Sequence, residues 1–238
     1  MNPVVEWALG PEKDDPLVAE EVRKYVTAAG RPSATMAGMA FPGTFMLDRQ
    51  GRVTSRFFED LYFERNTVSN VMARAGGSSP AVAATKISTA HLDVVAFPSD
   101  EAIAAGNRFS LIFDVAPHRG IHVYAPGASS YRIVSISVTP QPFVQLQPLR
   151  YPQSEIYFFK PLNERVPVYQ KPFRLIQDVL LEGTAQAQTA LQGKDSLTIA
   201  ASFEYQACDD RECYNPATVP ITFTLSLRSL IRARPQVR

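Results

Sequence analysis

Short runs of alternating apolar and polar residues dominate the chain from Lys86 onward. The clearest run covers residues 108–117, where four apolar side chains share one face of a strand: Phe109, Leu111, Phe113 and Val115. Comparable runs predict strands at 91–97, 121–127, 132–139, 143–146, 166–169, 173–181, 197–205 and 219–227. The stretch 151–161 is interrupted by prolines and is predicted to be a connection. Short strands at regular spacing, without a strong helix, are typical of an antiparallel β-sandwich.

The first 75 residues follow a different pattern. Residues 15–26 carry an apolar stripe at helical spacing, with Asp15 as the N-cap and Pro16 at the first helical position. A β-hairpin is predicted next, with strands at 44–47 and 53–58 joined by a turn that needs Gly51.

A second helix is predicted from Thr67 to Ala75, ended by two glycines. Residues 76–85 are small and uncharged, so we expect a linker at 76–86. The predicted organisation is therefore an α/β segment at 1–75, the linker at 76–86, a sandwich at 87–228 and a basic tail at 229–238, which makes the fold class mainly β.

Composition and charge narrow the function classes. The chain has 238 residues, of which 45% are hydrophobic and 20% charged, as expected for one large or two ordinary globular domains. The net charge of +1 argues against nucleic-acid binding as the main function of the chain. No run approaches the ~18 apolar residues of a transmembrane helix, so none is predicted. The N-terminus lacks a basic region followed by an apolar core, so no signal peptide is predicted.

The candidate chemistry lies in the two cysteines, Cys208 and Cys213, which four residues separate. β-type residues on both sides predict a hairpin, which brings the two sulfurs close enough for a disulfide. Because the stabilisation by a disulfide grows with loop length, a bridge across so short a loop stabilises the fold little, which favours a redox role. A plain hairpin staple and two unpaired thiols remain alternatives.

Neither a metal nor a cofactor is expected at the cysteines. Two thiolates need further ligands to hold zinc, and the three histidines, His91, His118 and His122, are distant in the sequence. Asp209 and Asp210 follow Cys208, and we expect their charges to raise the thiol pKa values, with Arg211 opposing them. Such thiols would exchange slowly without a docked partner, which suits a protein-to-protein electron carrier better than a peroxidase.

Residues 205–216, Tyr-Gln-Ala-Cys-Asp-Asp-Arg-Glu-Cys-Tyr-Asn-Pro, resemble the active-site hairpin of the N-terminal periplasmic domain of DsbD-type thiol:disulfide interchange proteins. The resemblance implies an immunoglobulin-like sandwich in which Cys208 and Cys213 shuttle electrons from a membrane domain to periplasmic partner proteins. The best-known members have one more residue between the cysteines, so the local geometry and the redox poise of this chain can differ from theirs.

The same resemblance implies residues that line the site. The stretch 121–127, Ile-His-Val-Tyr-Ala-Pro-Gly, is similar to an aromatic strand beside the cysteines of the family, which points to His122 and Tyr124. His122 would then donate or accept a proton near neutral pH, although a lone histidine in a strand is more often structural. Tyr205 and Tyr214 bracket the cysteines and are either site residues or ordinary strand aromatics.

The family also shields its disulfide with an aromatic cap loop. Two stretches of this chain are candidates for that loop: residues 129–131 and residues 151–157.

Residues 41–53, Phe-Pro-Gly-Thr-Phe-Met-Leu-Asp-Arg-Gln-Gly-Arg-Val, are similar to a hairpin of thioredoxin-like proteins, especially the alkyl-hydroperoxide-reductase/redoxin branch. The resemblance makes Pro42 a candidate for that family's cis-proline. The redox cysteines of the family lie upstream, and this chain has no cysteine before Cys208. Residues 1–75 are therefore interpreted as the C-terminal half of a redoxin domain, or else as a small α/β appendage. A half-domain leaves sheet edges uncovered, which predicts pairing with another chain, such as a homo-oligomer.

Three functions follow from these observations. The first is a thiol:disulfide oxidoreductase module working through Cys208 and Cys213, with thioredoxin-like or redoxin proteins and a membrane electron transporter as partners. The second is a non-catalytic binding or assembly module with a structural disulfide. The third and weakest is a peroxiredoxin-like antioxidant protein. The resemblance implies a periplasmic or other extracytoplasmic location, and without it the chain would be placed in the cytoplasm.

Overall fold

The computed structural model describes residues 43–58, 64–77, 83–159 and 163–228. By compactness the chain divides into two units, Met1–Asn66 and Thr67–Arg238. The helix predicted at 15–26, the candidate cis-proline Pro42 and the tail 229–238 lie outside the described residues. In the part of the chain that is described, no helix is long and apolar enough to cross a bilayer.

The first unit contains the predicted hairpin, which is confirmed. Strands β1 (Gly43–Leu47) and β2 (Val53–Phe58) pair antiparallel. Asp48 stabilises the turn because its Oδ1 accepts hydrogen bonds from the backbone N–H groups of Gln50 and Arg52, each at 2.9 Å. Gly51 has a φ of 76°, which a residue with a Cβ rarely adopts. This unit also holds the short strand β3 (Arg65–Asn66). A thioredoxin-like domain is not established by these elements and stays a prediction.

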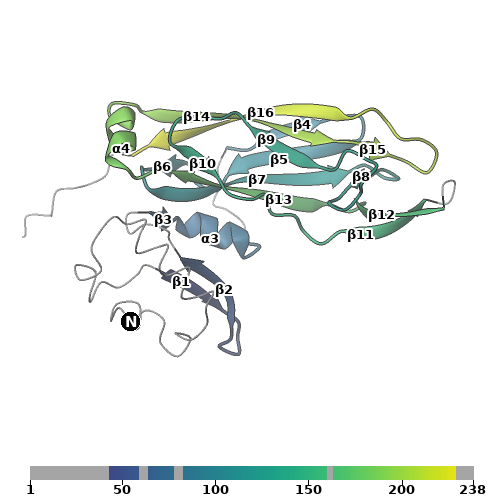
Figure 1. Ribbon diagram of the computed structural model, residues 1–238, viewed down its shortest axis with the longest axis horizontal. Helices are drawn as coiled ribbons and strands as arrows, with labels where there is room; N and C mark the ends of the chain where they lie inside the picture. The colour runs from purple at the N-terminus through teal and green to yellow at the C-terminus, as the bar shows by residue number, and fades with distance from the viewer. Residues whose placement is uncertain (1–42, 59–63, 78–82, 160–162, 229–238) are drawn as a thin grey trace, which may run out of the picture. The chain divides into compact units, whose positions relative to one another are not determined.

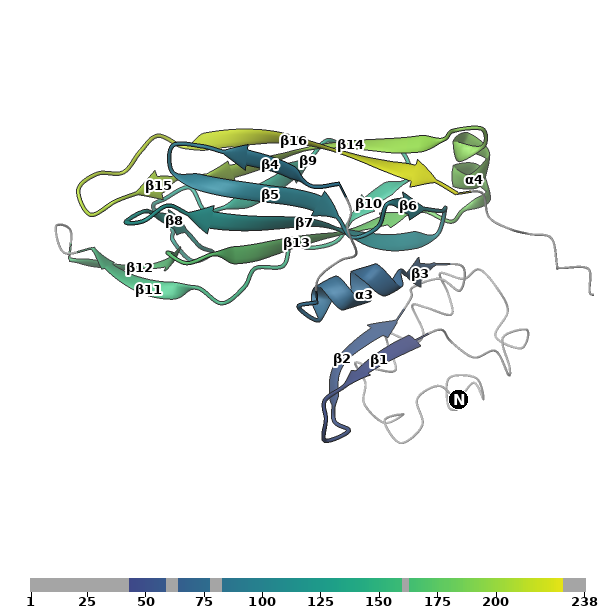
Figure 2. The ribbon, with the colours of Figure 1, turned by 180° about the vertical axis from the view of Figure 1, so that it is seen from behind.

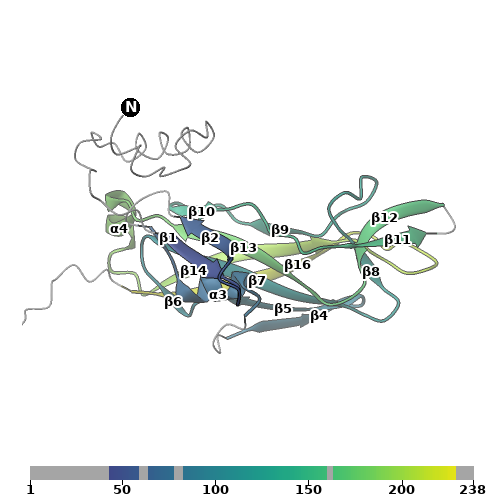
Figure 3. The same ribbon diagram turned by 90° about the horizontal axis from the view of Figure 1, so that it is seen from below.

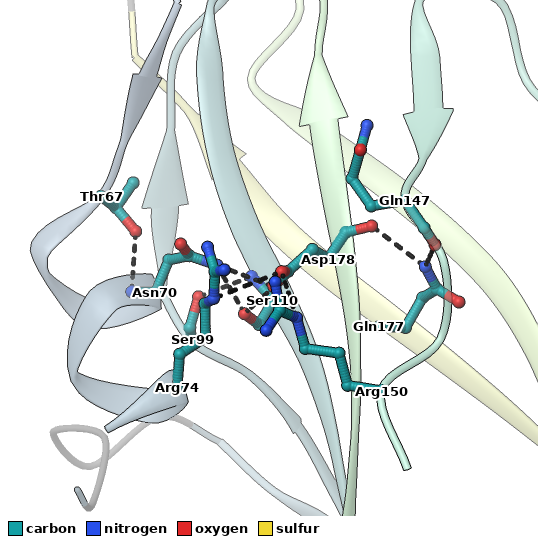
Figure 4. A network of polar contacts seen from close by, with 9 residues as sticks. All are labelled: Thr67, Asn70, Arg74, Ser99, Ser110, Gln147, Arg150, Gln177 and Asp178. Atoms are coloured by element: carbon teal, nitrogen blue, oxygen red, sulfur yellow. Dashed lines mark hydrogen bonds and ion pairs between the residues drawn. The ribbon is translucent and has the colours of Figure 1, made fainter. Parts of the chain in front are cut away.

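The helix predicted at 67–75 is confirmed as α3 (Val68–Arg74), capped by Thr67, whose Oγ1 accepts a hydrogen bond from the Asn70 N–H at 3.0 Å. The structure places this helix with the sandwich. The Asn70 side chain donates hydrogen bonds to Ser110 Oγ at 2.7 Å and to Asp178 Oδ1 at 2.9 Å (Figure 4). The second compact unit begins at Thr67 and therefore includes α3, and the predicted domain boundaries stay a prediction.

The described residues of the second unit form three sheets, whose strands Figures 1 and 2 label. One sheet has the order β10 (Val144–Leu146), β13 (Phe173–Leu181), β7 (Asn107–Pro117), β5 (Leu92–Pro98) and β4 (Thr85–Ser88). The facing sheet has the order β6 (Ala102–Ile103), β16 (Ala217–Leu227), β14 (Ser196–Tyr205) and β9 (Ser135–Val138). A smaller sheet has the order β11 (Glu155–Phe159), β12 (Glu164–Tyr169), β8 (His122–Tyr124) and β15 (Ala207–Cys208). Among the neighbouring strands in these three orders, β6 and β16 pair parallel and the others pair antiparallel.

The main core lies between the first two sheets, as the alternating sequence pattern predicts. Along β16, residues 219, 221, 223 and 225 are buried and their neighbours are exposed. Phe113 of β7 meets Phe223 of β16 edge to face, with ring centroids 5.6 Å apart. These contacts confirm a mainly β fold made of packed antiparallel sheets.

The structure differs from the prediction at several elements. Strand β4 begins at Thr85, inside the predicted linker 76–86, and the short strands β3, β6 and β15 were not predicted. Residues 155–159, predicted to belong to a connection, form strand β11, because pairing with β12 outweighs the nearby prolines. Residues 185–191 form a short helix, α4 (Ala185–Leu191), where no helix was predicted. Thr184 caps it, and alanine and glutamine favour the helical conformation. Within the second unit, α4 lies at one end and strands β8, β11 and β12 lie at the other (Figures 1 and 3).

A buried carboxylate, Asp178 of β13, joins α3 to the sheet (Figure 4). The hydroxyl of Ser110 donates to Asp178 Oδ1 at 2.8 Å, beside the Asn70 bond. Arg74 and Arg150 approach Oδ2 with their Nε atoms at 3.7 and 3.4 Å. The Asp178 side chain is 3% exposed, so these groups replace the water that its charge would otherwise need.

Candidate functional site

The cysteines lie where the chain leaves one sheet and joins another. Strands β14 and β16 pair as far as Tyr205 and Ala217, as the prediction of a hairpin requires. The following strand β15 pairs instead with β8, Ala207 opposite Val123 and Cys208 opposite His122. The sequence could not show this change of sheet, because it depends on a pairing between residues more than eighty positions apart in the chain.

Cys208 and Cys213 form a disulfide across the tip of the hairpin. The two residues also face each other as an antiparallel bridge, and the Tyr214 N–H donates to the Ala207 carbonyl at 2.9 Å. The predicted alternative of two unpaired thiols is therefore wrong for this state of the protein.

Asp209 organises the turn between the cysteines. Its N–H donates to the Glu212 carbonyl at 3.0 Å, which leaves Asp210 and Arg211 at the tip. Its Oδ1 accepts from the N–H groups of Arg211 and Glu212 at 2.7 and 2.8 Å. Its Oδ2 accepts from the Tyr214 hydroxyl at 2.9 Å. The hydrogen bonds from the Glu212 and Arg211 backbone, followed by that from Tyr214, hold the pKa of Asp209 below its usual value.

The two sulfurs differ in access. Cys208 is 1% exposed and belongs to a small apolar cluster with Tyr124, Ala128, Val166 and Val168. Cys213 is exposed on the other side of the turn. A reagent that approaches from solvent therefore reaches Cys213 first.

Tyr124 of β8 contacts both sulfurs. Its hydroxyl oxygen lies 2.9 Å from Cys208 Sγ and 3.2 Å from Cys213 Sγ. The hydroxyl is the donor in both contacts, because the sulfurs of a disulfide carry no hydrogen. Burial, followed by the neighbouring Tyr131, raises the pKa of Tyr124 far above its usual value. The hydroxyl therefore keeps its proton at every physiological pH.

Two further tyrosines cover the strand that carries Tyr124. Tyr131 stacks on Tyr124, with ring centroids 4.0 Å apart and planes 9° apart, and its hydroxyl donates to Glu164 Oε2 at 2.7 Å. Tyr157 of β11 packs on His122, with centroids 4.4 Å apart, and donates to Asp210 Oδ1 at 2.6 Å. This hydrogen bond is the main reason that the pKa of Tyr157 rises to about 12.

Sequence reasoning did not single out Tyr131 and Tyr157 as site residues. Both fall in the stretches that were candidates for an aromatic cap, 129–131 and 151–157. The structure brings one aromatic side chain from each stretch to the site. The sequence could not choose between the stretches, because both contribute.

His122 lies beside the disulfide, as the resemblance implied. It is 2% exposed, and its ring meets Tyr124 at 88° with centroids 5.6 Å apart. Burial lowers the pKa of His122, and the charges of Asp210 and Asp209 oppose that shift. The hydrogen bond to the sulfurs comes from Tyr124, so the role of His122 as a proton donor or acceptor stays a prediction.

Tyr205 and Tyr214 occupy different surroundings from those of Tyr124. Tyr205 is buried in the main core beside Phe203, and its hydroxyl donates to Thr89 Oγ1 at 3.0 Å. Tyr214 packs on His91, with ring centroids 4.3 Å apart, and hydrogen-bonds to Asp209. Tyr214 therefore supports the turn, whereas Tyr205 anchors the base of the hairpin.

Metal ligands do not gather at the site. Among the residues that the structure describes, no group of three or more histidine, cysteine or acidic side chains is placed to hold a metal ion. The chemistry available from these residues is that of the disulfide, the tyrosine hydroxyls and the carboxylates of the turn.

Comparison with solved structures shows partial likenesses. The N-terminal periplasmic domain of ScsB from Proteus mirabilis is 11% identical, with a TM-score of 0.43, over 61% of this chain and 51% of that one. The periplasmic chaperone SfaE is 7% identical, with a TM-score of 0.26, over 59% of this chain and 61% of that one. The chain thus spans about half the length of the ScsB structure. No curated protein matches the sequence.

Comparison with protein families gives a match over residues 94–225, which include the cysteine hairpin, Tyr124 and the strands around them. The family is described as the N-terminal part of the thiol:disulfide interchange protein DsbD. Because the match spans more than half of the sequence, the chain belongs to the family of DsbD N-terminal domains.

Proposed function

We propose that the sandwich is a thiol:disulfide exchange module that passes electrons through Cys208 and Cys213. One observation carries the proposal: a disulfide between an exposed and a buried cysteine, both of whose sulfurs contact the Tyr124 hydroxyl. A disulfide that served only as a staple would need neither an accessible sulfur nor a hydrogen-bond donor. Membership of the family supports the same conclusion.

Reduction of the module begins at the exposed sulfur. A thiolate of the partner attacks Cys213 Sγ, a bond forms between these two sulfurs, and the Cys208–Cys213 bond breaks. The electron pair of that bond leaves on Cys208 Sγ as a thiolate. A second thiolate of the partner then attacks the partner's own sulfur in the mixed disulfide and releases Cys213. The partner dithiol becomes a disulfide, two electrons enter the module, and the two cysteines end as thiols after taking protons from water.

Tyr124 stabilises the thiolate that forms on the buried sulfur of Cys208. A thiolate in apolar surroundings is unfavourable, and Cys208 lies in such surroundings. The Tyr124 hydroxyl is already 2.9 Å from that sulfur and donates to it as the negative charge develops. A hydrogen bond to a charged group contributes about 1.5–3 kcal/mol net.

The proposed partners are proteins with an accessible dithiol or disulfide. A thioredoxin-like or redoxin protein would accept electrons from the module, and a membrane electron transporter would supply them. We extend the proposal to residues 1–75, interpreted as part of a redoxin domain that accompanies the module. An extracytoplasmic location suits a disulfide of this kind, because such compartments allow disulfides to persist.

The first test is the reduction potential of the Cys208–Cys213 pair, measured by equilibration with glutathione and with a thioredoxin. If the proposal is correct, the disulfide exchanges rapidly with the thioredoxin, and its reduction potential is close enough to those of glutathione and thioredoxin for both to reduce it. A structural bridge would resist the thioredoxin and have a potential below about −300 mV. That result would favour the non-catalytic binding module instead.

The order of attack is tested with two serine variants. Cys208→Ser keeps the exposed thiol, which is first converted to a mixed disulfide with 5-thio-2-nitrobenzoate; the single thiolate of a thioredoxin that lacks its resolving cysteine should then displace thionitrobenzoate from Cys213 and accumulate as a mixed disulfide with it. Cys213→Ser keeps only the buried thiol and serves as the matched control, for which little adduct is expected. Equal trapping by both variants would show that the exposed sulfur is not the point of entry.

A further inference from the structure

We propose that Asp209 is a positioning residue that holds the hairpin closed after reduction and thereby favours the disulfide at equilibrium. The inference rests on the exchange site proposed above and concerns how strongly that site retains its disulfide. The short spacing of the cysteines allows a two-residue tip at Asp210 and Arg211.

The contacts of Asp209 close the turn without using either sulfur. Its carboxylate accepts from two backbone N–H groups through Oδ1 and from the Tyr214 hydroxyl through Oδ2. Its own N–H donates to the Glu212 carbonyl. Tyr214 is itself fixed, because its ring packs on His91 and its N–H donates to Ala207. Breaking the disulfide therefore leaves these hydrogen bonds in place.

A closed turn keeps the two thiols near each other. Re-forming the disulfide then costs little conformational entropy, because the loop is already ordered. The disulfide in turn holds the backbone in the conformation that Asp209 binds. The two effects reinforce each other, so the loss of the Asp209 contacts must lower the stability of the disulfide relative to the dithiol.

The equilibrium with glutathione measures this coupling. Two molecules of glutathione give up their thiol hydrogens and form one glutathione disulfide, while the Cys208–Cys213 bond breaks and two cysteine thiols form. For Asp209→Ala we expect the constant for disulfide formation to fall about tenfold, the size of one or two net hydrogen bonds. A tenfold change equals about 30 mV for this two-electron couple. The potential of the variant should become less negative by that amount.

Asp209→Asn distinguishes the effect of the hydrogen bonds in the turn from the effect of the negative charge. An asparagine Oδ1 still accepts from the two backbone N–H groups, and its Nδ2 donates to the Tyr214 hydroxyl in place of the bond that Oδ2 accepted, but the negative charge beside the thiols is lost. We expect this variant to stay within about twofold of the unchanged protein. Asp210→Ala is the matched control, because Asp210 carries the same charge in the same turn and binds Tyr157 rather than the turn backbone. It too should shift the constant by less than about twofold.

Tyr214→Phe gives a second test that does not depend on the folding of Asp209→Ala. It removes one hydrogen bond to Oδ2 and keeps the backbone bonds of the turn, so a shift of about threefold in the same direction is expected. The inference is overturned if Asp209→Ala and Tyr214→Phe leave the constant unchanged. It is also overturned if Asp209→Asn shifts the constant as much as Asp209→Ala, because the charge would then be the cause. No partner protein takes part, so slow exchange with a thioredoxin would refute the proposed function and leave this result standing.

Discussion

Two buried polar clusters in the sandwich unit differ in the access that they allow. Around Asp178, a carboxylate that is 3% exposed is enclosed by Ser110, Asn70 and two arginines. Around Tyr124, a hydroxyl holds a disulfide of which one sulfur, that of Cys213, is exposed. Both clusters satisfy polar atoms inside the protein, as burial requires. The difference teaches that access, rather than the presence of a buried polar network, separates a reactive site from one that holds a helix on a sheet.

Replacing Asp178 should have the largest effect and should affect stability alone. Asp178→Ala leaves Arg74, Asn70 and Ser110 without their shared acceptor, which should lower the free energy of unfolding by about 3 kcal/mol. Urea unfolding followed by circular dichroism measures the loss. The reduction potential should stay unchanged, because the hydrogen bonds and ion pairs of the Asp178 carboxylate lead to α3, β7 and Arg150. A shift in potential would show that the two clusters are coupled and would break the comparison.

Replacing Tyr124 should have a smaller effect and should act on exchange. Tyr124→Phe keeps the ring that stacks on Tyr131 and removes the hydrogen bond to both sulfurs. Losing about 1.5–3 kcal/mol of stabilisation of the leaving thiolate raises the barrier by that amount, which corresponds to a fall of about 10- to 150-fold in the rate of reduction by a small dithiol. Stopped-flow fluorescence or quenched labelling measures this rate.

The control for Tyr124 is Tyr131→Phe. This variant keeps the stacked pair and loses a hydrogen bond to Glu164, which is more distant from the sulfurs. The rate should change by less than about threefold. If both variants slowed exchange equally, the aromatic packing rather than the hydroxyl of Tyr124 would be responsible.

The smallest effect expected is a pH dependence from His122. Because burial lowers its pKa below 6.5, the folded protein binds this proton less tightly than the unfolded chain does. The stability contributed by neutral His122 is therefore complete above pH 6.5 and falls as the pH drops through that value toward the folded pKa. Asp209 and Asp210 oppose the shift and make it smaller.

Urea unfolding at several pH values tests this sign. The free energy of unfolding should rise with pH just below 6.5, and the rise should weaken in His122→Gln. Carboxylates also titrate toward lower pH, so the difference between the two proteins carries the result. An identical pH profile for both proteins would mean that burial does not lower the pKa of His122.

Much of the fold could be predicted from alternation along the strands. The strand predicted at 173–181 has those bounds, and the strands beside the cysteines begin or end within two residues of the prediction. Strand β11 and helix α4 were missed, because their local signals are weak and pairing or capping decides them. At the site, the sequence pointed to the two cysteines, His122 and Tyr124, and it reached Tyr131 and Tyr157 only as members of two alternative stretches for a cap loop.

The sequence by itself determined the hairpin, its two cysteines and the alternating strands that carry it, because these depend on neighbours in the chain. The tertiary structure decided what the hairpin can do. It paired β15 with β8, placed Tyr124 against both sulfurs, buried Cys208 and left Cys213 exposed. These features depend on contacts between residues far apart in the sequence, and their strength comes from the exclusion of water around them. The local sequence pattern indicates neither these contacts nor the exclusion of water.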